Sequence, residues 1–422
     1  TSNRTRGNNS AKSESKLRPA PASALRLLLT GMSKFWPLSS FAALLAIWAV
    51  YNGRSAYNLL VPAPLPGSYF VRGNSSCKTI KHKYSDRLKF CEDLTPWTTS
   101  DTAGNERHRI IASCDPGRYE WNTVMGPLLD PEPKGNLWVL NPDAEDLNPQ
   151  PLNLENFDSA HDFHPLGIDI FPGAANEPST LFVINHMRDS KRTVEVFELY
   201  DENPPRLLHV KQLYHPMFWA PNSVAALSHK DFFLSIDHWF KKDGLWPWKL
   251  FMPVVESALM LPLGMVEYVQ FGSSGINVTV PAIGVPFANG LALSKDGSRL
   301  AVASTSACKV KVYQVNGEGL KLVDSINLPF SPDNMGYEQD GSLTVAGHPH
   351  FPSILRYSKR KQSTSPSWVV SISDRIQSPQ DDTNLQTPYS VYNRTNTHAR
   401  YSVKTLYQSN GSGWSASSTA LW

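Results

Sequence analysis

The sequence lacks several features that mark common enzyme classes. Its 422 residues hold no Cys/His set with zinc spacing, no glycine-rich loop that could cradle a phosphate and no G-x-S-x-G motif. These absences argue against a zinc site, a nucleotide-phosphate site and the nucleophile elbow of the α/β-hydrolases. Helical periodicity is scarce outside two segments, and proline is frequent, at 33 residues. The chain is long enough for one large all-β domain or two ordinary ones.

Cysteine is also scarce. Four cysteines fit one or two disulfides in an oxidising compartment, namely Cys77, Cys91, Cys114 and Cys308. Four N-x-S/T sequons agree with a glycosylated, lumenal body, at Asn74, Asn277, Asn393 and Asn410.

An excess of basic charge is missing from most of the chain. Residues 1–34 carry seven Lys/Arg and one acid, so they account for +6, and the remainder is −3 although the whole chain is +3. This basic segment is rich in Ser, Asn and Pro, so we expect it to be disordered. The remainder has no basic face suited to phosphates, which excludes nucleic acid as a partner.

One uncharged stretch, 35–53, follows the basic segment. Its 19 residues are just long enough to span a bilayer, and Trp36, Trp48 and Tyr51 suit the two interfaces. We expect a membrane anchor with 1–34 in the cytoplasm, a linker over 54–76 and the rest in the secretory lumen or outside. A cleaved signal peptide, which would give a secreted protein, and a buried helix of the fold are the alternatives.

A strand-rich unit recurs along the chain. Three stretches share one plan of Asn, alternating apolar residues, a polar turn and a second strand, at 220–238, 287–305 and 331–349. A looser copy runs over 164–171 and 180–186, and a further alternating segment follows each copy, at 193–199, 265–271, 309–315 and 353–358. The spacing from Asn289 to Asn334 is 45 residues. A repeat of this length is typical of a β-propeller.

The repeat also predicts the number of blades. Segments 107–113 and 135–141 form an earlier blade, and 411–422 begins a last one. We therefore expect an all-β, six-bladed propeller whose last blade is incomplete, with one inserted helix within 245–264.

The register of the repeat suggests a cation site. Asn222, Asn289 and Asn334 enter the innermost strands at equivalent positions, so they converge on the axis together with Asp333. Each alone would be explained as a turn former. Several neutral oxygens with one or two carboxylates are the ligands that Ca²⁺ prefers. Glu92 of the first blade can add another carboxylate.

Several motifs together resemble the serum paraoxonase/arylesterase family. They are "FCEDL", "HPLGID", "LFVINH", "TVEVFEL", "FLSIDHWF", "PFANGLALSKDG" and "PDNMGYEQDGSLTVAGHP". The resemblance covers 77–422 and is densest over 157–358. It implies a calcium-dependent lactonase or aryl esterase on a six-bladed propeller, acting on a small-molecule ester or lactone.

The resemblance also implies site residues. The catalytic calcium would be held by Glu92, Asn222, Asn289, Asp333 and Asn334. A second, structural calcium would use Asp93 and the backbone carbonyl of Ile168, together with an acid where this chain has Ser223.

The family's histidine dyad is only partly present. Leu166 stands where the first histidine is expected, and the second matches His186. His164 lies two residues from the vacant position and, by strand alternation, on the same face. His238 matches a further pocket position. Cys77 matches a bridging cysteine whose partner strand this chain does not contain.

Segment 245–264 is apolar but broken by three prolines. We expect a short helix over the channel mouth that contacts lipid through Trp246 and Trp248, or else a lid that belongs to the core. For the whole chain, a calcium-stabilised binding propeller without catalysis is the alternative to a hydrolase. An alkaloid-condensing propeller of the plant type shares the architecture, but the oxygen-rich axial shell argues against it.

Overall fold

The computed structural model describes residues 23–62, 64–65, 84, 86–100, 103–129, 134–143, 148–158, 162–189, 191–374 and 400–421, with the backbone alone for 23–39 and 41. Contacts divide the chain into two units, 1–51 and 52–422. Residues 1–22, positions 63 and 66–76 of the expected linker (with Asn74), and Cys77 at the start of the expected propeller lie outside the described part. So does Asn393.

Helix α1 (Ser23–Leu60) contains the whole of the stretch 35–53. In the part of the chain that the structure describes, no helix is both long enough and apolar enough for a membrane crossing. The last turns of α1 belong to the second unit, where Ala56 and Leu59 are buried.

Five sheets form the second unit. Each is antiparallel, except that β5 runs parallel to β9. The first sheet contains β1 (Cys91–Ser100), β2 (Glu106–Cys114), β3 (Asn136–Leu140) and β4 (Gln150–Pro151); the second contains β5 (Leu154–Glu155), β6 (Pro165–Phe171), β7 (Ser179–His186), β8 (Arg192–Tyr200) and β9 (Arg206–Tyr214). The third contains β10 (Pro221–Ala226), β11 (Asp231–Ile236), β12 (Gly264–Gly272) and β13 (Gly275–Val285); the fourth contains β14 (Ala288–Leu293), β15 (Arg299–Ser304), β16 (Lys309–Asn316) and β17 (Gly319–Asn327). The fifth contains β18 (Ser331–Tyr337), β19 (Leu343–His348), β20 (Ser367–Asp374) and β21 (Tyr401–Ser409).

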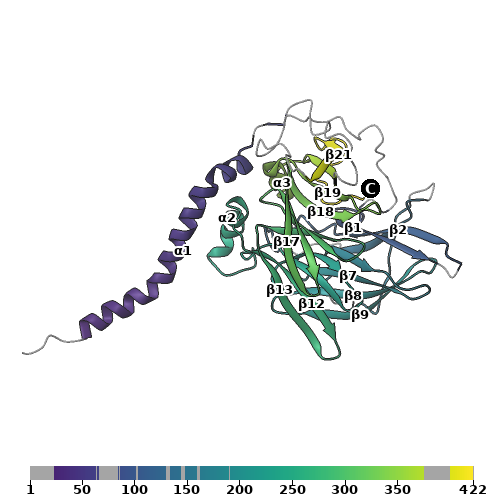
Figure 1. Cartoon of the computed structure of the whole chain (residues 1–422), viewed down its shortest axis with the longest axis horizontal. Coiled ribbons are helices and arrows are strands. Elements are labelled where there is room, and N and C mark those ends of the chain that lie inside the picture. Colours follow the sequence, from purple (N-terminus) through teal and green to yellow (C-terminus); the bar gives the residue numbers. More distant parts are fainter. Residues whose placement is uncertain are drawn as a thin grey trace, which may run out of the picture. The chain divides into compact units, whose positions relative to one another are not determined.

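The sheets are arranged as blades. The first strand of each repeat contacts the first strand of the next, in the order β1, β6, β10, β14 and β18. Figure 1 shows the strands of a blade side by side, as in β7, β8 and β9. The all-β propeller fold predicted from the repeats is therefore confirmed, and the segments expected at 193–199, 265–271 and 309–315 are β8, β12 and β16.

The blade count differs from the prediction, because the described residues form five sheets rather than six. Segment 411–421 forms no strand. It runs between β18 and β1. The backbone carbonyl of Ser418 accepts a hydrogen bond from the backbone N–H of Asn334 (2.8 Å), and Ser418 Oγ donates to the Cys91 carbonyl (3.3 Å). A blade needs further strands to pair with this segment, and the described residues supply none.

Segment 353–358 was predicted as a strand, and this prediction is wrong. It belongs to helix α3 (Phe351–Ser358), with Pro352 in the first turn, where a missing N–H is tolerated. The third strand of this blade is β20 instead. Short apolar runs do not distinguish a strand from a buried helical turn, which explains the error.

The inserted helix is confirmed. Segment 245–264 contains the 3₁₀ turn η1 (Trp248–Leu250) and helix α2 (Met252–Ala258). Helix α2 buries Met252 and Glu256, while Trp246 is 74% exposed.

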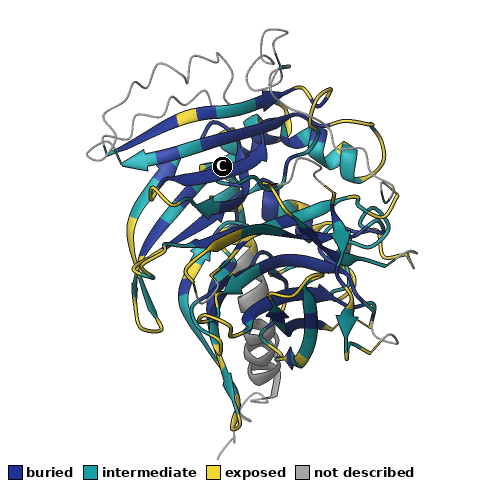
Figure 2. Ribbon diagram, turned by 90° about the vertical axis from the view of Figure 1, so that its right-hand side faces the viewer, coloured by how far each residue is buried: buried dark blue, intermediate teal, exposed yellow. Residues whose placement is uncertain are grey.

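Hydrophobic clusters fill the spaces between successive blades. Separate clusters join blades one and two, two and three, three and four, and four and five. Figure 2 shows that buried residues follow the strands and exposed ones the turns. Each fully buried Leu or Phe contributes about 1.5–3 kcal/mol. This packing fixes the inner strands, whose ends carry the candidate site.

Candidate functional site

Each of the five inner strands carries a β-bulge at an equivalent place. The register shifts between Cys91 and Asp93 in β1, Pro165 and Ile168 in β6, Pro221 and Val224 in β10, Ala288 and Leu291 in β14, and Pro332 and Met335 in β18. A bulge releases residues from the ladder and redirects their side chains. The residues released here are Glu92, Leu166–Gly167, Asn222–Ser223, Asn289–Gly290 and Asp333–Asn334. The five residues predicted to hold calcium therefore all lie in bulges.

Two glycines allow neighbouring bulges to touch. A Cβ on Gly290 would lie 2.4 Å from the Asp333 carbonyl oxygen and 3.0 Å from Asn334 Oδ1. A Cβ on Gly167 would lie 2.4 Å from the Asn222 carbonyl oxygen. Only glycine permits this approach, so these contacts bring the fourth blade to the fifth and the second blade to the third.

Four of the five predicted ligands present a buried oxygen without a hydrogen-bond partner among the described residues. These atoms are Glu92 Oε2, Asn222 Oδ1, Asn289 Oδ1 and Asn334 Oδ1. Buried polar atoms of folded proteins almost always have a partner, and a set of such oxygens is suited to bind a cation. The side-chain nitrogen of Asn334, Nδ2, donates to Glu92 Oε1 (3.2 Å) and to the Glu92 backbone carbonyl (3.0 Å). This leaves Asn334 Oδ1 free.

For Asp333, the fifth predicted ligand, the described residues show a hydrogen bond at one carboxylate oxygen, Oδ2. His348 Nε2 lies 2.9 Å from Asp333 Oδ2. Burial raises the pKa of Glu92 well above its usual range, and the neighbouring Asp93 and Asp333 raise it further. A divalent cation would offset this concentration of negative charge. Among the described residues, no group of three or more His, Cys, Asp and Glu side chains could hold a metal ion. The predicted calcium set differs from such a group because three of its five members are amides. Its oxygens fit Ca²⁺.

The residues of the second predicted calcium site have internal partners. Asp93 Oδ2 accepts from the Ile168 amide (3.0 Å), and Asp93 Oδ1 accepts from the Leu94 amide (2.9 Å). Ser223 Oγ accepts from the Leu291 amide (3.0 Å). Burial raises the pKa of Asp93 to about 7 in spite of these bonds. Each oxygen of Asp93 thus accepts one backbone hydrogen bond, and Ser223 offers a hydroxyl instead of the expected carboxylate.

His186 has both ring nitrogens engaged. Its Nε2 lies 2.7 Å from the Pro221 carbonyl oxygen, and its Nδ1 lies 2.9 Å from Thr123 Oγ1. A carbonyl can only accept, so Nε2 carries the proton and Nδ1 accepts from the threonine hydroxyl. Burial lowers the pKa of His186 well below its usual range, and Arg192 lowers it further. The ring is therefore neutral and fully bonded.

His164 differs, because one ring nitrogen is free. Its Nδ1 lies 2.9 Å from Asp115 Oδ2, and its Nε2 is buried without a hydrogen-bond partner among the described residues. The ring of Trp121 lies beside it, tilted by 31° with centroids 5.8 Å apart, and Trp121 Nε1 donates to the His186 carbonyl (2.7 Å). The segment after β2 therefore contacts both histidines.

His238 connects the site to the inserted helix. Its Nε2 lies 2.7 Å from Ser257 Oγ on α2, and its Nδ1 lies 3.3 Å from Asp237 Oδ1. Burial lowers the pKa of His238, but Asp237 and Glu256 outweigh burial and raise it overall. Asn222 Nδ2 contacts Asp237 Oδ2 at 3.5 Å, so this chain of contacts reaches a predicted ligand.

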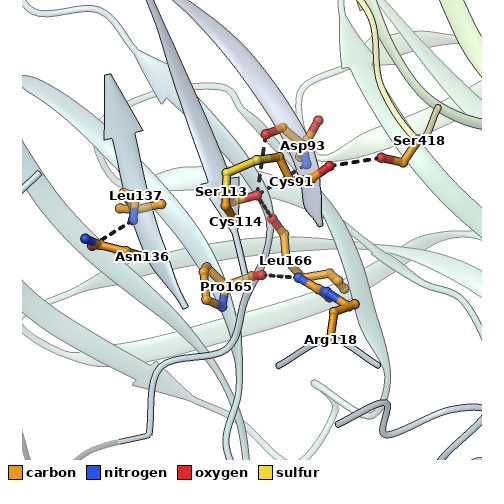
Figure 3. Close-up of a disulfide and its surroundings, with 10 residues drawn as sticks. All are labelled: Cys91, Asp93, Ser113, Cys114, Arg118, Asn136, Leu137, Pro165, Leu166 and Ser418. Carbon is orange, nitrogen blue, oxygen red and sulfur yellow. Dashed lines mark hydrogen bonds between the residues drawn. A yellow bond between two sulfur atoms is a disulfide. The ribbon is translucent and has the colours of Figure 1, made fainter. Parts of the chain in front are cut away.

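A disulfide joins Cys91 and Cys114 directly beside the site. Glu92 follows the first cysteine and Asp115 follows the second. Figure 3 shows that Ser113 Oγ donates to the Leu166 carbonyl and Arg118 to the Pro165 carbonyl. No sequence pattern indicated this pairing. Asp115 was also missed, since only the fold brings it to His164.

Comparison with known proteins supports the resemblance. A model of the arylesterase family matches residues 126–418. The chain is 30% identical to serum paraoxonase/arylesterase 1 of Mus musculus over 236 residues, which are 54% of this chain and 61% of that protein. It is also 30% identical to the Homo sapiens protein of the same name over 241 residues, which are 56% of this chain and 64% of that protein. It is 25% identical to serum paraoxonase/lactonase 3 of Oryctolagus cuniculus over 233 residues, which are 55% of this chain and 62% of that protein. The match thus spans less than two thirds of each relative.

Proposed function

The chain belongs to the paraoxonase/arylesterase family, and we propose on this premise that it is a calcium-dependent hydrolase of lactones or aryl esters. One observation carries the proposal, namely the four unpartnered, buried oxygens of Glu92, Asn222, Asn289 and Asn334. They lie in bulges of four different blades. No single local motif would place them together.

The chain's own residues would provide the metal shell. Glu92, Asn222, Asn289, Asp333 and Asn334 would hold the ion. A calcium ion bound there supplies a positive charge that polarises an ester carbonyl and stabilises the developing oxyanion. His348 holds one oxygen of Asp333, which leaves the other oxygen of this carboxylate for the ion. Three histidines are candidates to move a proton: His186, His164 and His238.

The test is a matched pair of substitutions. Asn289→Ala removes one of the four oxygens, and Asn316→Ala alters an exposed asparagine at the end of β16. Calcium binding by calorimetry and hydrolysis of a lactone panel and phenyl acetate are measured for both. We expect Asn289→Ala to lose calcium affinity and activity together, with Asn316→Ala unchanged. Full activity of Asn289→Ala, or wild-type turnover in chelator, would overturn the proposal.

A calcium-stabilised binding propeller is the second candidate. Leu166 at the vacant dyad position and the fully bonded ring of His186 favour it. Calcium at 100 times its Kd would then stabilise the fold by about 2.7 kcal/mol without any ester or lactone being hydrolysed. Turnover that follows calcium occupancy would remove this candidate.

A lipid surface is a further proposed partner. Leu245, Trp246 and Phe251 lie exposed beside helix α2, with Trp239 nearby in sequence. Exposed tryptophan and leucine in a short helical insert suit a membrane interface. Helix α2 touches the site through Ser257 and His238, so docking there would place a lipid-derived ester close to the metal shell.

A further inference from the structure

The three candidate histidines differ in what their ring nitrogens contact. His186 has a partner on each nitrogen. Ser257 Oγ donates to the Pro253 carbonyl, so it accepts from His238 Nε2; His238 Nδ1 has no hydrogen bond within the described residues, but it faces the Asp237 carboxylate at 3.3 Å rather than open space for a substrate. His164 alone of the three combines a carboxylate on Nδ1 with a free, buried Nε2. A base needs an unshared lone pair that faces its substrate, so this difference separates the candidates.

We propose that His164 is the base that activates water in this site, and that Asp115 is the residue that positions it. This inference rests on the proposed function and specifies its proton transfer. Asp115 can only accept, so it places the proton of the neutral ring on Nδ1 and the lone pair on Nε2. Asp115 is itself held, because its Oδ1 accepts from the Gly117 amide (2.9 Å).

The backbone places His164 at the metal end of its blade. It directly precedes Pro165, where the bulge of β6 begins, and Gly167 of that bulge packs on the Asn222 backbone. Hydrogen bonds from Ser113 and Arg118 to the carbonyls of Leu166 and Pro165 hold this segment against the end of β2. His164 therefore lies between the blade of Glu92 and the blade of Asn222.

The step balances without a redox partner. His164 Nε2 takes a proton from water while the water oxygen bonds to the carbonyl carbon. The bond from that carbon to the alkoxide or phenoxide oxygen then breaks, and His164 returns the proton to the leaving oxygen. The products are the carboxylic acid and the alcohol or phenol, which for a lactone are one molecule.

His186 then has a positioning role. It accepts from Thr123 Oγ1, donates to the Pro221 carbonyl and offers its own carbonyl to Trp121. These contacts hold the segment that follows Asp115. Loss of the His186 ring would disturb the site through this segment and leave the base in place.

The test uses substitutions that keep the local contacts. His164→Asn retains an N–H donor near Asp115 but removes the base, and Asp115→Asn keeps shape but removes the acceptor. His229→Asn is the control, because His229 is exposed and bonded to Thr180. With calcium saturating, we expect kcat on the lactone panel to fall by about 10² or more for His164→Asn. The calcium-binding midpoint should stay within twofold, and the control should be unchanged.

A second readout needs neither turnover nor metal. Nitrogen-15 shifts of the His164 ring should report an Nδ1–H tautomer in the metal-free protein, and Asp115→Asn should abolish that preference. An Nε2–H tautomer in the wild type, or an active wild type with a fully active His164→Asn variant, would overturn this inference alone. A wild type that hydrolyses no lactone or aryl ester would overturn the proposed function itself.

Discussion

Glu267 on β12 is a buried acid for which the described residues offer no hydrogen-bond partner at either oxygen. It faces the cluster between the second and third blades, opposite Leu234 of β11. Burial raises the pKa of Glu267 from 4.5 to about 8. The folded protein therefore holds a proton here that the unfolded chain loses near neutral pH.

The sign of the effect follows from this difference. The stability that the protonated Glu267 contributes to the fold is fully present below pH 4.5, falls as the pH rises and is completely lost above about pH 8. One pKa unit corresponds to about 1.4 kcal/mol, so the loss is roughly 3 kcal/mol at pH 7 and roughly 5 kcal/mol above pH 8. Glu267→Gln cannot ionise, so it should escape the loss.

The assay is urea unfolding at pH 5 and at pH 8 with constant free calcium. Glu267→Gln should gain several kcal/mol over the wild type at pH 8 and less than about 1 kcal/mol at pH 5. Glu177→Gln is the control, because Glu177 is exposed in the bend between β6 and β7. If wild type and Glu267→Gln lost equal stability between the two pH values, the reasoning would be refuted.

Three further predictions concern the disulfide, the bulges and the inserted helix. Replacing Cys91 and Cys114 together by Ser should lower the free energy of unfolding by about 3 kcal/mol, because the bridge closes a loop of 23 residues; an unchanged urea midpoint would count against it. Gly290→Ala should destabilise the fold by about 1–3 kcal/mol and weaken calcium binding, since its Cβ would lie 2.4 Å from the Asp333 carbonyl oxygen. Gly272→Ala is the control, because a Cβ on Gly272 would have nothing within 4 Å. Equal effects of the two substitutions on unfolding and on calcium binding would contradict the close contact at Gly290. Trp246→Ser should reduce binding to phosphatidylcholine vesicles several-fold in co-sedimentation without changing the melting temperature, and undiminished binding would exclude this face.

The repeat pattern predicted the propeller and the shared register of three asparagines in its inner strands. Asn222, Asn289 and Asn334 share a register in the sequence, and the structure places each in a bulge at that register. Such residues could be found because a repeated unit repeats its geometry. The blade count and the strand expected at 353–358 failed where the copies were short and where an apolar run suits a helix equally well.

The environment of the base could not be predicted. Asp115 lies 49 residues before His164, in an irregular segment whose course no periodicity reveals. The disulfide partners were equally hidden, because four cysteines allow several pairings. The match of His186 to the family dyad rested on its position in the sequence, whereas the hydrogen bonds that separate His186 from His164 depend on tertiary packing.

Lactone hydrolysis by the wild-type chain should be measured as a function of free calcium, beside its calcium-binding curve. We expect no turnover in chelator and a rate that rises with the occupancy of one site, because the described residues present one shell of unpartnered oxygens and the second predicted site is internally bonded. A rate independent of calcium, or calcium binding without turnover on any lactone or aryl ester, would contradict this expectation.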